Sequence, residues 1–415
     1  MPFIRNIPSS WIYLAIRFLT LGIRFLFFAL FFRYSETVYG AYSLVATTVT
    51  LGVYFLGLDF YYYANREMLK PGRTVSHVFL HQLLFYLPVY LVFLPLFYLF
   101  FHAGFLDRSY LWLFYAVLIA EHLSYELFRL LFILKKPLLA NINLFFRNGF
   151  GFALALGHLY FYGHIDIKSI LIYWLSGDLI SILISVSGIP FSLKSWKKTL
   201  GKPDLSWIKK GLAVSMPFFL ATISYKIIEF SDRYMIDWFL DKKSLGVYAF
   251  FSNIALLVNT VVYTAVISLL FPGLVESLLS GRKEEFRNKF RIFKRKIFRW
   301  SGLTTVGVIL SMPALLLLLH KQEHLHKYYV FVLLVLGNWI LNLSYAYHYI
   351  LYGKNKDWII FRSTALAALI NIVLNLLLIP VTGLAGAALA TLLAFVIIYI
   401  IKKRKTLQYL RKTEA

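Results

Sequence analysis

The sequence contains no cysteine, and few of its 415 residues are charged. Without cysteine, neither disulfide bonds nor thiol chemistry are available to the protein. Charged residues make up 15% of the chain and hydrophobic residues 60%, whereas about a quarter of the residues in a soluble domain are charged. These proportions exclude a soluble globular protein. Long apolar runs recur along the whole sequence, and this pattern predicts an all-α polytopic membrane protein.

Motifs of several enzyme and pump classes are also missing. The sequence has no Walker A motif, no glycine-rich dinucleotide loop and no HExxH zinc motif. His320, His324 and His326 lie close together in LLHKQEHLHKYY, but no further ligand set accompanies them. We therefore expect loop histidines and no metal site. The protein is expected to be neither an enzyme nor an ATP-driven pump, and to hold no cofactor.

The apolar runs have the length of transmembrane helices. A hydrocarbon core of about 30 Å requires roughly 20 helical residues, and on this basis the sequence predicts twelve spans. Their ranges are 10–32, 38–64, 77–102, 109–134, 138–163, 168–192, 211–240, 244–271, 300–320, 325–352, 356–380 and 383–402. Barrel strands are excluded because the runs lack polar alternation.

Lysine and arginine are unevenly distributed over the connections between these spans. The termini and the even-numbered loops hold 29 of them, and the odd-numbered loops hold 7. Under the positive-inside rule, this bias places both termini in the cytoplasm. The net charge of +24 is then mainly a topology signal and an attraction to anionic lipid. Nucleic acid is not an expected partner.

Two basic segments suggest how the chain is organised. Residues 193–210 separate a first six-helix bundle at 1–192 from a second at 211–402, and residues 403–415 form a basic cytoplasmic tail. The second basic segment, EEFRNKFRIFKRKIF, places apolar residues at helical spacing, which predicts an amphipathic cytoplasmic helix at about 274–299 lying on the inner leaflet. A solvated basic loop is the alternative. The apolar positions are Phe286, Phe290, Phe293 and Ile297.

Charged residues also fall inside the predicted spans. The cations are Arg17, Arg24, Arg129, Arg147, Lys226, Arg233 and Arg362. The acids are Asp59, Glu121, Glu126, Asp178, Glu229, Asp232 and Asp237. Each such charge costs roughly 2.5–3.5 kcal/mol near the centre of a membrane helix. We therefore expect these side chains to face a bundle interior or a wet cavity.

Their spacing suggests two kinds of role. Arg17 and Arg24 are seven residues apart and share one face of the first span. Pairs at i,i+3 or i,i+4 could simply neutralise each other. Glu126 with Arg129 is one such pair, and Glu229 is expected to hold Arg233, which would leave Lys226 as the freer cation. Cations outnumber nearby acids on the first and fifth spans, and this surplus predicts an anionic guest, with diphosphate the obvious one at a membrane.

Candidate site residues follow from this interpretation. The diphosphate is expected against Arg17, Arg24, Arg147, Lys226 and Arg233. The sugar-contacting candidates are Asn148, Tyr225 and Asn253. The candidates for coupling a proton or sodium ion are Glu121, Asp178, Glu229 and Asp232.

Three stretches of the sequence resemble a known family. The segment from Ser215 to Pro272 has a proline early in the seventh span (Pro217), the Asp232–Arg233 pair, a Gly246-x-Tyr248 turn and a closing proline. NIVLNLLLIPVTGLAGAALATLLA, with Gly383 and Gly386, is similar to the last hairpin of that family, and YGAYSLVATTVTLGVYFLGLDFYYYANRE to its second span. Together they resemble the polysaccharide-type, Wzx-like lipid-linked oligosaccharide flippases of the MATE-related (MOP) superfamily.

The resemblance implies a fold and a function. The fold would be two six-helix bundles forming a V around a central cavity that opens to each side in turn. The activity would be translocation of an undecaprenyl-diphosphate-linked oligosaccharide, such as an O-antigen repeat unit, from the inner to the outer leaflet of the bacterial cytoplasmic membrane. Related peptidoglycan-precursor flippases hold diphosphate with arginines on the first span, and Arg17 and Arg24 are placed to match. Membrane lipids and a polysaccharide polymerase are the other expected partners.

Two alternatives remain. A cation-coupled multidrug exporter of the same superfamily would bind cationic guests, and the surplus of positive charge argues against it. A membrane-embedded polysaccharide polymerase or glycosyltransferase usually has a sizeable outer loop, whereas the longest loops here are predicted to be cytoplasmic and basic.

Overall fold

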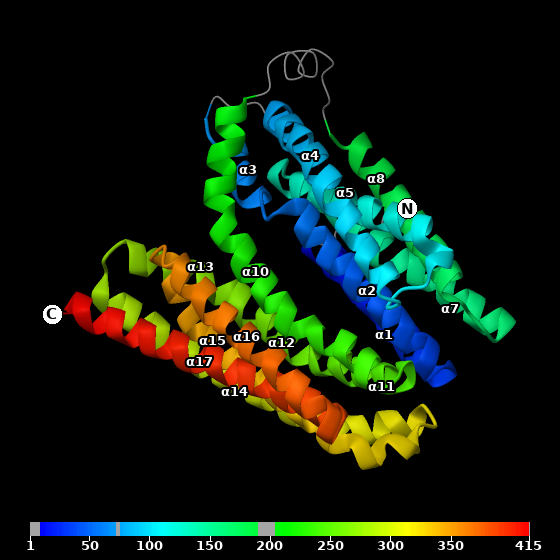
Figure 1. Ribbon diagram of the computed structural model, residues 1–415. Helices are drawn as coiled ribbons and strands as arrows, with labels where there is room; N and C mark the ends of the chain where they lie inside the picture. Colours follow the sequence, from blue (N-terminus) through cyan, green and yellow to red (C-terminus); the bar gives the residue numbers. More distant parts are fainter. Residues whose placement is uncertain (1–8, 72–74, 190–203, 415) are drawn as a thin grey trace, which may run out of the picture. The chain divides into compact units, whose positions relative to one another are not determined.

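The computed structural model describes residues 9–71, 75–189 and 204–414, and all regular secondary structure in these ranges is helical (Figure 1). The chain divides into two compact units, Met1–Phe219 and Leu220–Ala415. The boundary falls inside one long helix, α10 (Leu205–Phe239). The predicted linker at 193–210 lies mostly outside the described residues, and its last part forms the first turns of α10.

The first unit contains the helices that precede α10. They are α1 (Ser9–Tyr34), α2 (Glu36–Gly57), α3 (Tyr61–Met68), α4 (Val75–His102), η2 (Arg108–Tyr110), α5 (Leu111–Ile133), α6 (Pro137–Phe145), η3 (Phe146–Phe150), α7 (Gly151–Tyr162) and α8 (Ile167–Ser187). The predicted second span is broken where Leu58 and Asp59 adopt positive φ angles of 46° and 49°. The predicted fifth span is one helical run with a π turn, η3, in its middle.

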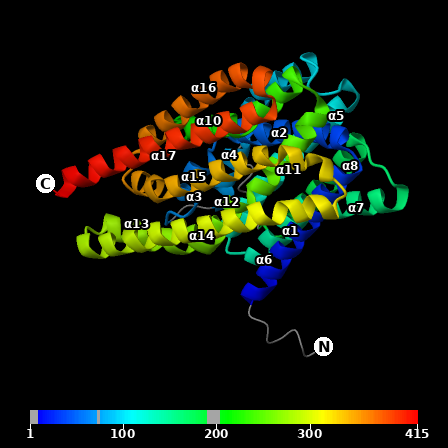
Figure 2. The same ribbon diagram turned by 90° about the horizontal axis from the view of Figure 1, so that it is seen from below.

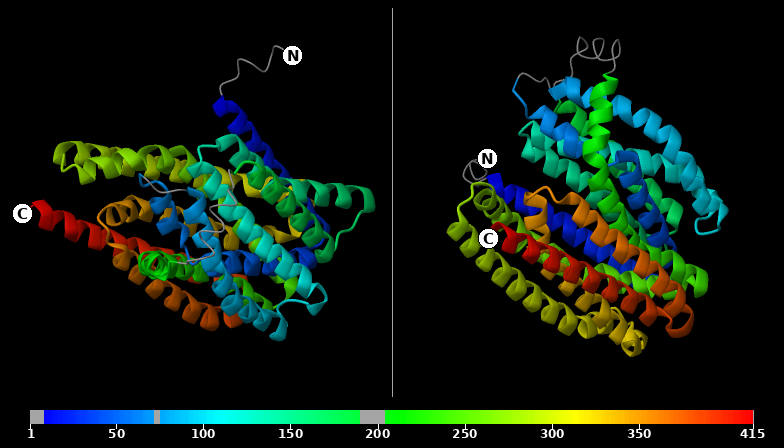
Figure 3. Two further views of the ribbon diagram at one scale, coloured as in Figure 1. Left: turned by 90° about the horizontal axis from the view of Figure 1, so that it is seen from above. Right: turned by 60° about the vertical axis from the view of Figure 1, so that its left-hand side comes forward.

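The second unit contains the rest of α10 and the helices that follow it. They are α11 (Lys242–Ala255), α12 (Leu257–Val262), η4 (Tyr263–Ile267), α13 (Ser268–Leu279), α14 (Lys283–Leu318), η5 (Gln322–Lys327), α15 (Tyr328–Gly353), α16 (Asp357–Thr382) and α17 (Leu384–Glu414). The long helices α14 to α17 run side by side (Figures 2 and 3). A second π turn, η4, interrupts the run from α11 to α13.

Short polar side chains mark where several helices begin. The Asp241 carboxylate accepts a hydrogen bond from the backbone N–H of Ser244 at 2.6 Å, and Asp166 accepts one from Ser169 at 2.9 Å. These bonds satisfy amide groups that have no partner within the first helical turn. At the start of η2, the backbone N–H of Ser109 holds the pKa of Asp107 below its ordinary value. Several of the chain's few acidic residues thus act as N-caps of helices.

The outer surfaces of the helices are apolar enough for lipid. Ten helical segments in the described ranges have the length and hydropathy to cross a membrane. Large apolar side chains such as Leu91 and Val381 are 79% and 81% exposed. The predicted spans at 109–134 and 138–163 are helical but lie outside those ten, and both carry charged or amide side chains that lower their hydropathy. The protein is a multi-pass membrane protein.

The amphipathic segment predicted at about 274–299 differs from the expectation. A turn at Gly281 divides it, and the part from Lys283 onward is continuous with the following span in α14. Its apolar side chains, Phe286, Phe290, Phe293 and Ile297, are buried in a core cluster with residues of α15. The helical spacing was interpreted correctly, but the apolar face packs against protein instead of lying on a leaflet.

Close packing of α7 against α8 depends on a glycine, which gives a test of the fold. A Cβ atom at Gly151 would lie 2.6 Å from the backbone oxygen of Tyr173, whereas a Cβ at Gly157 would meet nothing within 4 Å. We expect Gly151→Ala to destabilise the protein by about 1–3 kcal/mol through overpacking. Gly157→Ala should be neutral or stabilising by up to about 1 kcal/mol. Thermal unfolding of both variants in detergent can be followed by tryptophan fluorescence. Equal melting temperatures for Gly151→Ala and Gly157→Ala would contradict the close packing of α7 against α8.

Candidate functional site

Two arginines of the first unit lie exposed on α1. The Arg17 Nε–H donates to Asn141 Oδ1 of α6 at 2.8 Å. The Arg24 guanidinium lies over the rings of Phe28 and Phe152, at 5.5 and 5.7 Å from their centroids. Neither arginine has a carboxylate partner among the described residues. This agrees with the predicted surplus of positive charge on the first helix.

Arg147 is held in the π turn between α6 and α7, and it is buried. Its Nη1 lies 3.4 Å from Glu121 Oε1 of α5, and its guanidinium lies 4.4 Å from the ring centroid of Tyr125. When the Asn148 side-chain amide is turned so that its oxygen faces Arg147, this oxygen accepts a hydrogen bond from an Arg147 N–H at 3.2 Å. Glu121 is held from the other side by Trp174 Nε1–H at 3.1 Å. Two predicted site residues, Arg147 and Asn148, thus lie beside the predicted ion-coupling residue Glu121.

Asp178 of α8 is another predicted ion-coupling residue of the first unit. Its side chain is fully buried, and neither carboxylate oxygen has a hydrogen-bond donor among the described residues. An isolated ionised carboxylate is costly in such a place. A proton on the Asp178 carboxyl group would remove this cost.

Glu126 and Arg129 form a separate network that explains their presence in α5. They make an ion pair, as the i,i+3 spacing predicts, and Glu126 also accepts a hydrogen bond from Gln82 at 2.7 Å. The Arg129 guanidinium stacks on Tyr61 and Tyr125, with centroid distances of 3.5 and 3.9 Å. Both charges are compensated inside the first unit, so their role is structural.

The expected pairing in α10 is wrong. Glu229 pairs with Lys226, whose Nζ lies 2.7 Å from Glu229 Oε2. Arg233 instead donates to Asn253 Oδ1 of α11 at 3.2 Å and lies over the Phe230 ring. An i,i+3 pair is as accessible on a helix as an i,i+4 pair, and spacing alone did not distinguish them. Lys226 is therefore not the freer cation of this helix.

The predicted sugar contacts of the second unit are already engaged with these charges. Tyr225 stacks on Phe395 with a centroid distance of 6.3 Å, and Lys226 Nζ lies 5.7 Å from the Tyr225 ring. Asn253 accepts the hydrogen bond from Arg233. Asp237, which lies near the end of α10, pairs with Lys242 at 3.0 Å and closes the turn into α11.

Asp232 lies at the centre of a buried group of oxygen atoms. Its Oδ2 accepts hydrogen bonds from the Tyr248 hydroxyl and from Thr391 Oγ1, the latter at 3.4 Å. Asn371 reaches Thr391 at 3.5 Å, and Asn375 donates to Asn371 at 3.2 Å. Asp232 Oδ1 and Asn375 Oδ1 are buried and have no hydrogen-bond partner within the part of the chain that the structure describes. The hydrogen bonds thus join α10, α16 and α17 in one buried polar network that includes two unpartnered oxygen atoms.

Three members of this group escaped the sequence interpretation. Asn371 and Asn375 are four residues apart and therefore share one face of α16, which was a usable signal. Thr391 lies within a run of small residues, and its position in the sequence gave no usable signal. A second amide chain links α12 to α15, where Asn259 bonds to both Asn338 and Asn342 at 2.6 Å.

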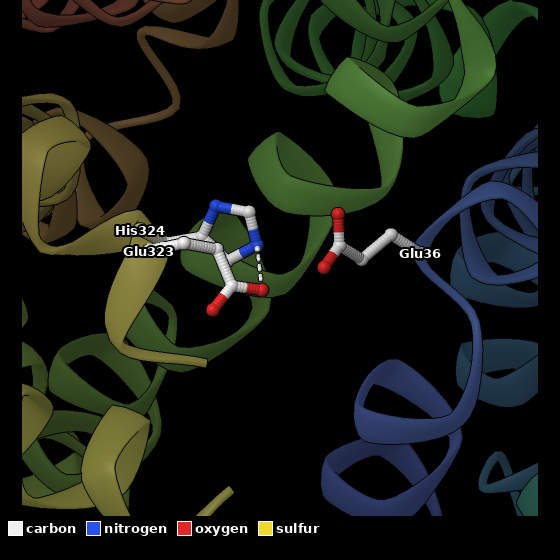
Figure 4. Close-up of side chains that lie close together, drawn as sticks. All are labelled: Glu36, Glu323 and His324. Carbon is white, nitrogen blue, oxygen red and sulfur yellow. Dashed lines mark ion pairs between the residues drawn. The ribbon is translucent and has the colours of Figure 1, made fainter. Parts of the chain in front are cut away.

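Two ion pairs of the histidine-rich loop can be described, and both are made by Glu323. Lys321 Nζ lies 3.8 Å from Glu323 Oε1. His324 Nε2 lies 3.9 Å from Glu323 Oε1 within η5 of the second unit (Figure 4). Glu323 is 57% exposed, and such a pair contributes little to stability in solvent. Glu36, also drawn in Figure 4, begins α2 of the first unit.

The fold is that of the MOP-type transporters. The chain is similar to the lipid II flippase MurJ in an inward closed conformation, with a TM-score of 0.68 and 15% identity over 95% of this chain and 87% of that one. A MATE protein in complex with MaD3S gives 0.59 and 12%, covering 95% and 94%. A MOP superfamily transporter from Pyrococcus furiosus gives 0.53 and 12%, covering 97% and 94%.

The sequence defines the family. A family model described as polysaccharide biosynthesis protein matches residues 9–278, more than half of the chain. The chain therefore belongs to the polysaccharide biosynthesis protein family. Comparison with curated proteins gives no match.

The structural role of the Glu126–Arg129 pair can be tested by a double-mutant cycle. Arg129→Leu leaves a buried carboxylate uncompensated, and we expect it to lower the free energy of unfolding by about 3–5 kcal/mol. Adding Glu126→Leu should recover part of this loss. Unfolding by a denaturing detergent in mixed micelles measures each variant. Lys242→Gln, which breaks the partly exposed pair with Asp237, is the control and should cost about 0–1 kcal/mol. Additive losses in the double variant would contradict a direct pair.

Proposed function

We propose that the protein is a flippase that moves an undecaprenyl-diphosphate-linked oligosaccharide, a repeat unit of O-antigen or another surface polysaccharide, from the inner to the outer leaflet of the bacterial cytoplasmic membrane. Membership of the polysaccharide biosynthesis family and the MOP-type fold support a transporter that serves this process. The observation that carries the proposal is the pair of exposed arginines on α1, Arg17 and Arg24. Cations without carboxylate partners on a membrane helix favour an anionic guest.

The diphosphate would be recognised first by Arg17 and Arg24. Guanidinium groups bind phosphate oxygens through paired, charge-assisted hydrogen bonds. Arg147, Lys226 and Arg233 already have partners, so in this proposal they bind only by exchanging those partners for the diphosphate. Asn148, Tyr225 and Asn253 would contact sugar during the same exchange. No covalent step is required.

Alternating access is the mechanism that we propose, with the lipid tail remaining in the bilayer. Two buried carboxyl groups are available for ion coupling. Asp232, with its unpartnered oxygen and its amide and hydroxyl neighbours, suits Na⁺ or a proton. Asp178, whose buried carboxylate oxygens have no hydrogen-bond donor among the described residues, suits a proton. Glu229, which is neutralised by Lys226, is the weaker candidate. Cytoplasmic placement of both termini remains a prediction from the loop charges.

A cation-coupled drug exporter is the second candidate of the same fold, and it is favoured only by the likeness to MATE structures. Exposed arginines on α1 would repel a cationic guest. A polymerase or glycosyltransferase usually has a sizeable outer loop, whereas the longest loops here are predicted to be cytoplasmic and basic.

The role of Arg17 and Arg24 predicts a large effect on flipping. In liposomes that contain labelled undecaprenyl-diphosphate-linked sugar, we expect Arg17→Ala with Arg24→Ala to slow translocation by roughly 100-fold or more, since each charge-assisted hydrogen bond contributes about 1.5–3 kcal/mol. Arg33→Ala on the same helix is the matched control and should keep the wild-type rate. Undiminished flipping by the folded double variant would refute the assignment, and export of cationic dyes by the wild type would favour the second candidate.

Ion coupling at Asp232 predicts a selective loss. Asp232→Asn removes the negative charge but keeps the shape, so flipping should continue while its stimulation by a Na⁺ or proton gradient falls by about tenfold or more, within the usual range of coupling energies. Asp237→Asn changes the same residue type in the same helix and should retain the stimulation. Gradients of each ion, imposed separately across the liposome membrane, identify the ion. Full stimulation in Asp232→Asn would transfer the role to Glu121 and Asp178.

A further inference from the structure

Tyr125 of α5 contacts two arginine side chains of the first unit. The centroid of its ring lies 3.9 Å from the guanidinium carbon of Arg129 and 4.4 Å from that of Arg147. Arg147 also lies over the ring of Phe128, at 5.4 Å from its centroid. The Phe128 and Tyr125 rings are themselves stacked, with a centroid distance of 6.1 Å. Two neighbouring rings of one helix thus support the Arg147 guanidinium group.

Helical spacing explains why these side chains meet. Glu121, Tyr125 and Arg129 follow one another at intervals of four residues, so they share one face of α5. Arg147 reaches this face from the π turn η3 and contacts both Glu121 and Tyr125. The side chain of Glu121 is 14% exposed, and Tyr125 is half-buried. This face of α5 is therefore accessible in part, although Arg147 itself is buried.

The ring contact and the carboxylate contact use different parts of the guanidinium group. A guanidinium group stacks on an aromatic ring through its flat face, whereas its five N–H groups point outward in its plane. Arg147 Nη1 lies 3.4 Å from Glu121 Oε1, which is long compared with the usual charge-assisted hydrogen bond of about 2.7–2.9 Å. The rings can therefore hold the guanidinium group in place while its N–H groups exchange Glu121 for another anion.

A comparison of three arginines of the first unit supports this division of roles. The guanidinium groups of Arg24, Arg129 and Arg147 each lie over two aromatic rings. Arg129 makes a close ion pair with Glu126, Arg147 makes the long contact with Glu121, and Arg24 has no carboxylate partner among the described residues. The two arginines that the proposed function assigns to the diphosphate are those with the weaker carboxylate contact. The aromatic contact is common to all three and does not depend on an acid.

We propose that Tyr125 is a positioning residue for the diphosphate of the lipid-linked sugar. Its ring holds the Arg147 guanidinium group while the Arg147 N–H groups leave Glu121 and bind a phosphate oxygen. The inference rests on the proposed function, because the diphosphate is the anion that displaces Glu121. In this proposal Tyr125 acts through Arg147 and does not itself bind the substrate, so the ring is required and the hydroxyl group is not.

The test measures the flipping rate in liposomes as a function of the amount of labelled undecaprenyl-diphosphate-linked sugar. Tyr125→Leu removes the ring, and we expect the half-saturating amount to rise roughly 2–30-fold, the range that one cation–π contact supports. Tyr125→Phe keeps the ring and should stay within about twofold of the wild type. The matched control is Tyr61→Leu, which removes a ring from Arg129 and should also stay within about twofold.

A double-mutant cycle separates positioning from a general structural role. If Tyr125 acts through Arg147, then adding Tyr125→Leu to Arg147→Gln should not raise the half-saturating amount further. Arg17 lies on another helix and is expected to contact the diphosphate independently. Adding Tyr125→Leu to Arg17→Ala should therefore multiply the two effects.

Three results would overturn the proposal. Equal effects of Tyr125→Leu and Tyr125→Phe would assign the role to the hydroxyl group. Equal effects of Tyr125→Leu and Tyr61→Leu would indicate that the rings only maintain the fold. Multiplied effects in the Arg147→Gln background would show that Tyr125 does not act through Arg147.

Two further outcomes are distinguishable from these. A wild type that flips no lipid-linked sugar would refute the proposed function, and this inference with it. If Tyr125→Leu fails to fold, as judged by its circular dichroism, Phe128→Leu replaces it. This variant removes the other ring from Arg147, and the half-saturating amount should then rise about twofold or more; an unchanged amount would contradict the proposal.

Discussion

The cost of placing charge in an apolar medium is the constraint on which this structure depends. A chain with 60% hydrophobic residues can fold in lipid only if each charged side chain inside a span finds a partner or a wet surface. Glu126 with Arg129 and Glu229 with Lys226 meet this requirement within single helices. Among the described residues, no such partner is found for the arginines of α1, the carboxyl group of Asp178 or the Oδ1 atom of Asp232, and these are the groups to which the proposed function assigns a role.

These exceptions differ in sign and in burial. Arg17 and Arg24 are exposed cations, whereas Asp178 and Asp232 are buried acids. An exposed cation can bind a large anionic substrate, whereas a buried carboxyl group can bind only something as small as a proton or a metal ion. Under the proposed function, carrying cargo and using an ion gradient would be separated by side-chain size and accessibility as well as by position.

Much of the fold could be predicted from the sequence, because hydropathy reports the main driving force directly. The helical class, the approximate span positions and the Glu126–Arg129 pair all followed from run length and from i,i+3 spacing. The choice of Lys226 over Arg233 as the partner of Glu229 could not be predicted, because both lie within reach and the decision depends on where Asn253 of α11 lies. Asn371, Asn375 and Thr391 became significant only once folding brought them to Asp232. The burial of Phe286 against α15 was likewise a tertiary outcome.

The π turns at Phe146–Phe150 and Tyr263–Ile267 have a consequence for helix phase. A π turn accommodates one extra residue without ending the helix, so everything beyond it is rotated by about 100° relative to an uninterrupted helix. In the first unit, this rotation allows the continuous helical run of α6, η3 and α7 to present the Arg147 side chain to Glu121 and then the Phe152 side chain to Arg24. The direction in which side chains point after the π turn is therefore independent of the direction in which they point before it. A single-residue insertion of this kind can change which neighbours one half of a membrane helix faces. The positions of the helix ends, the helix length and its exposure to lipid stay almost unchanged.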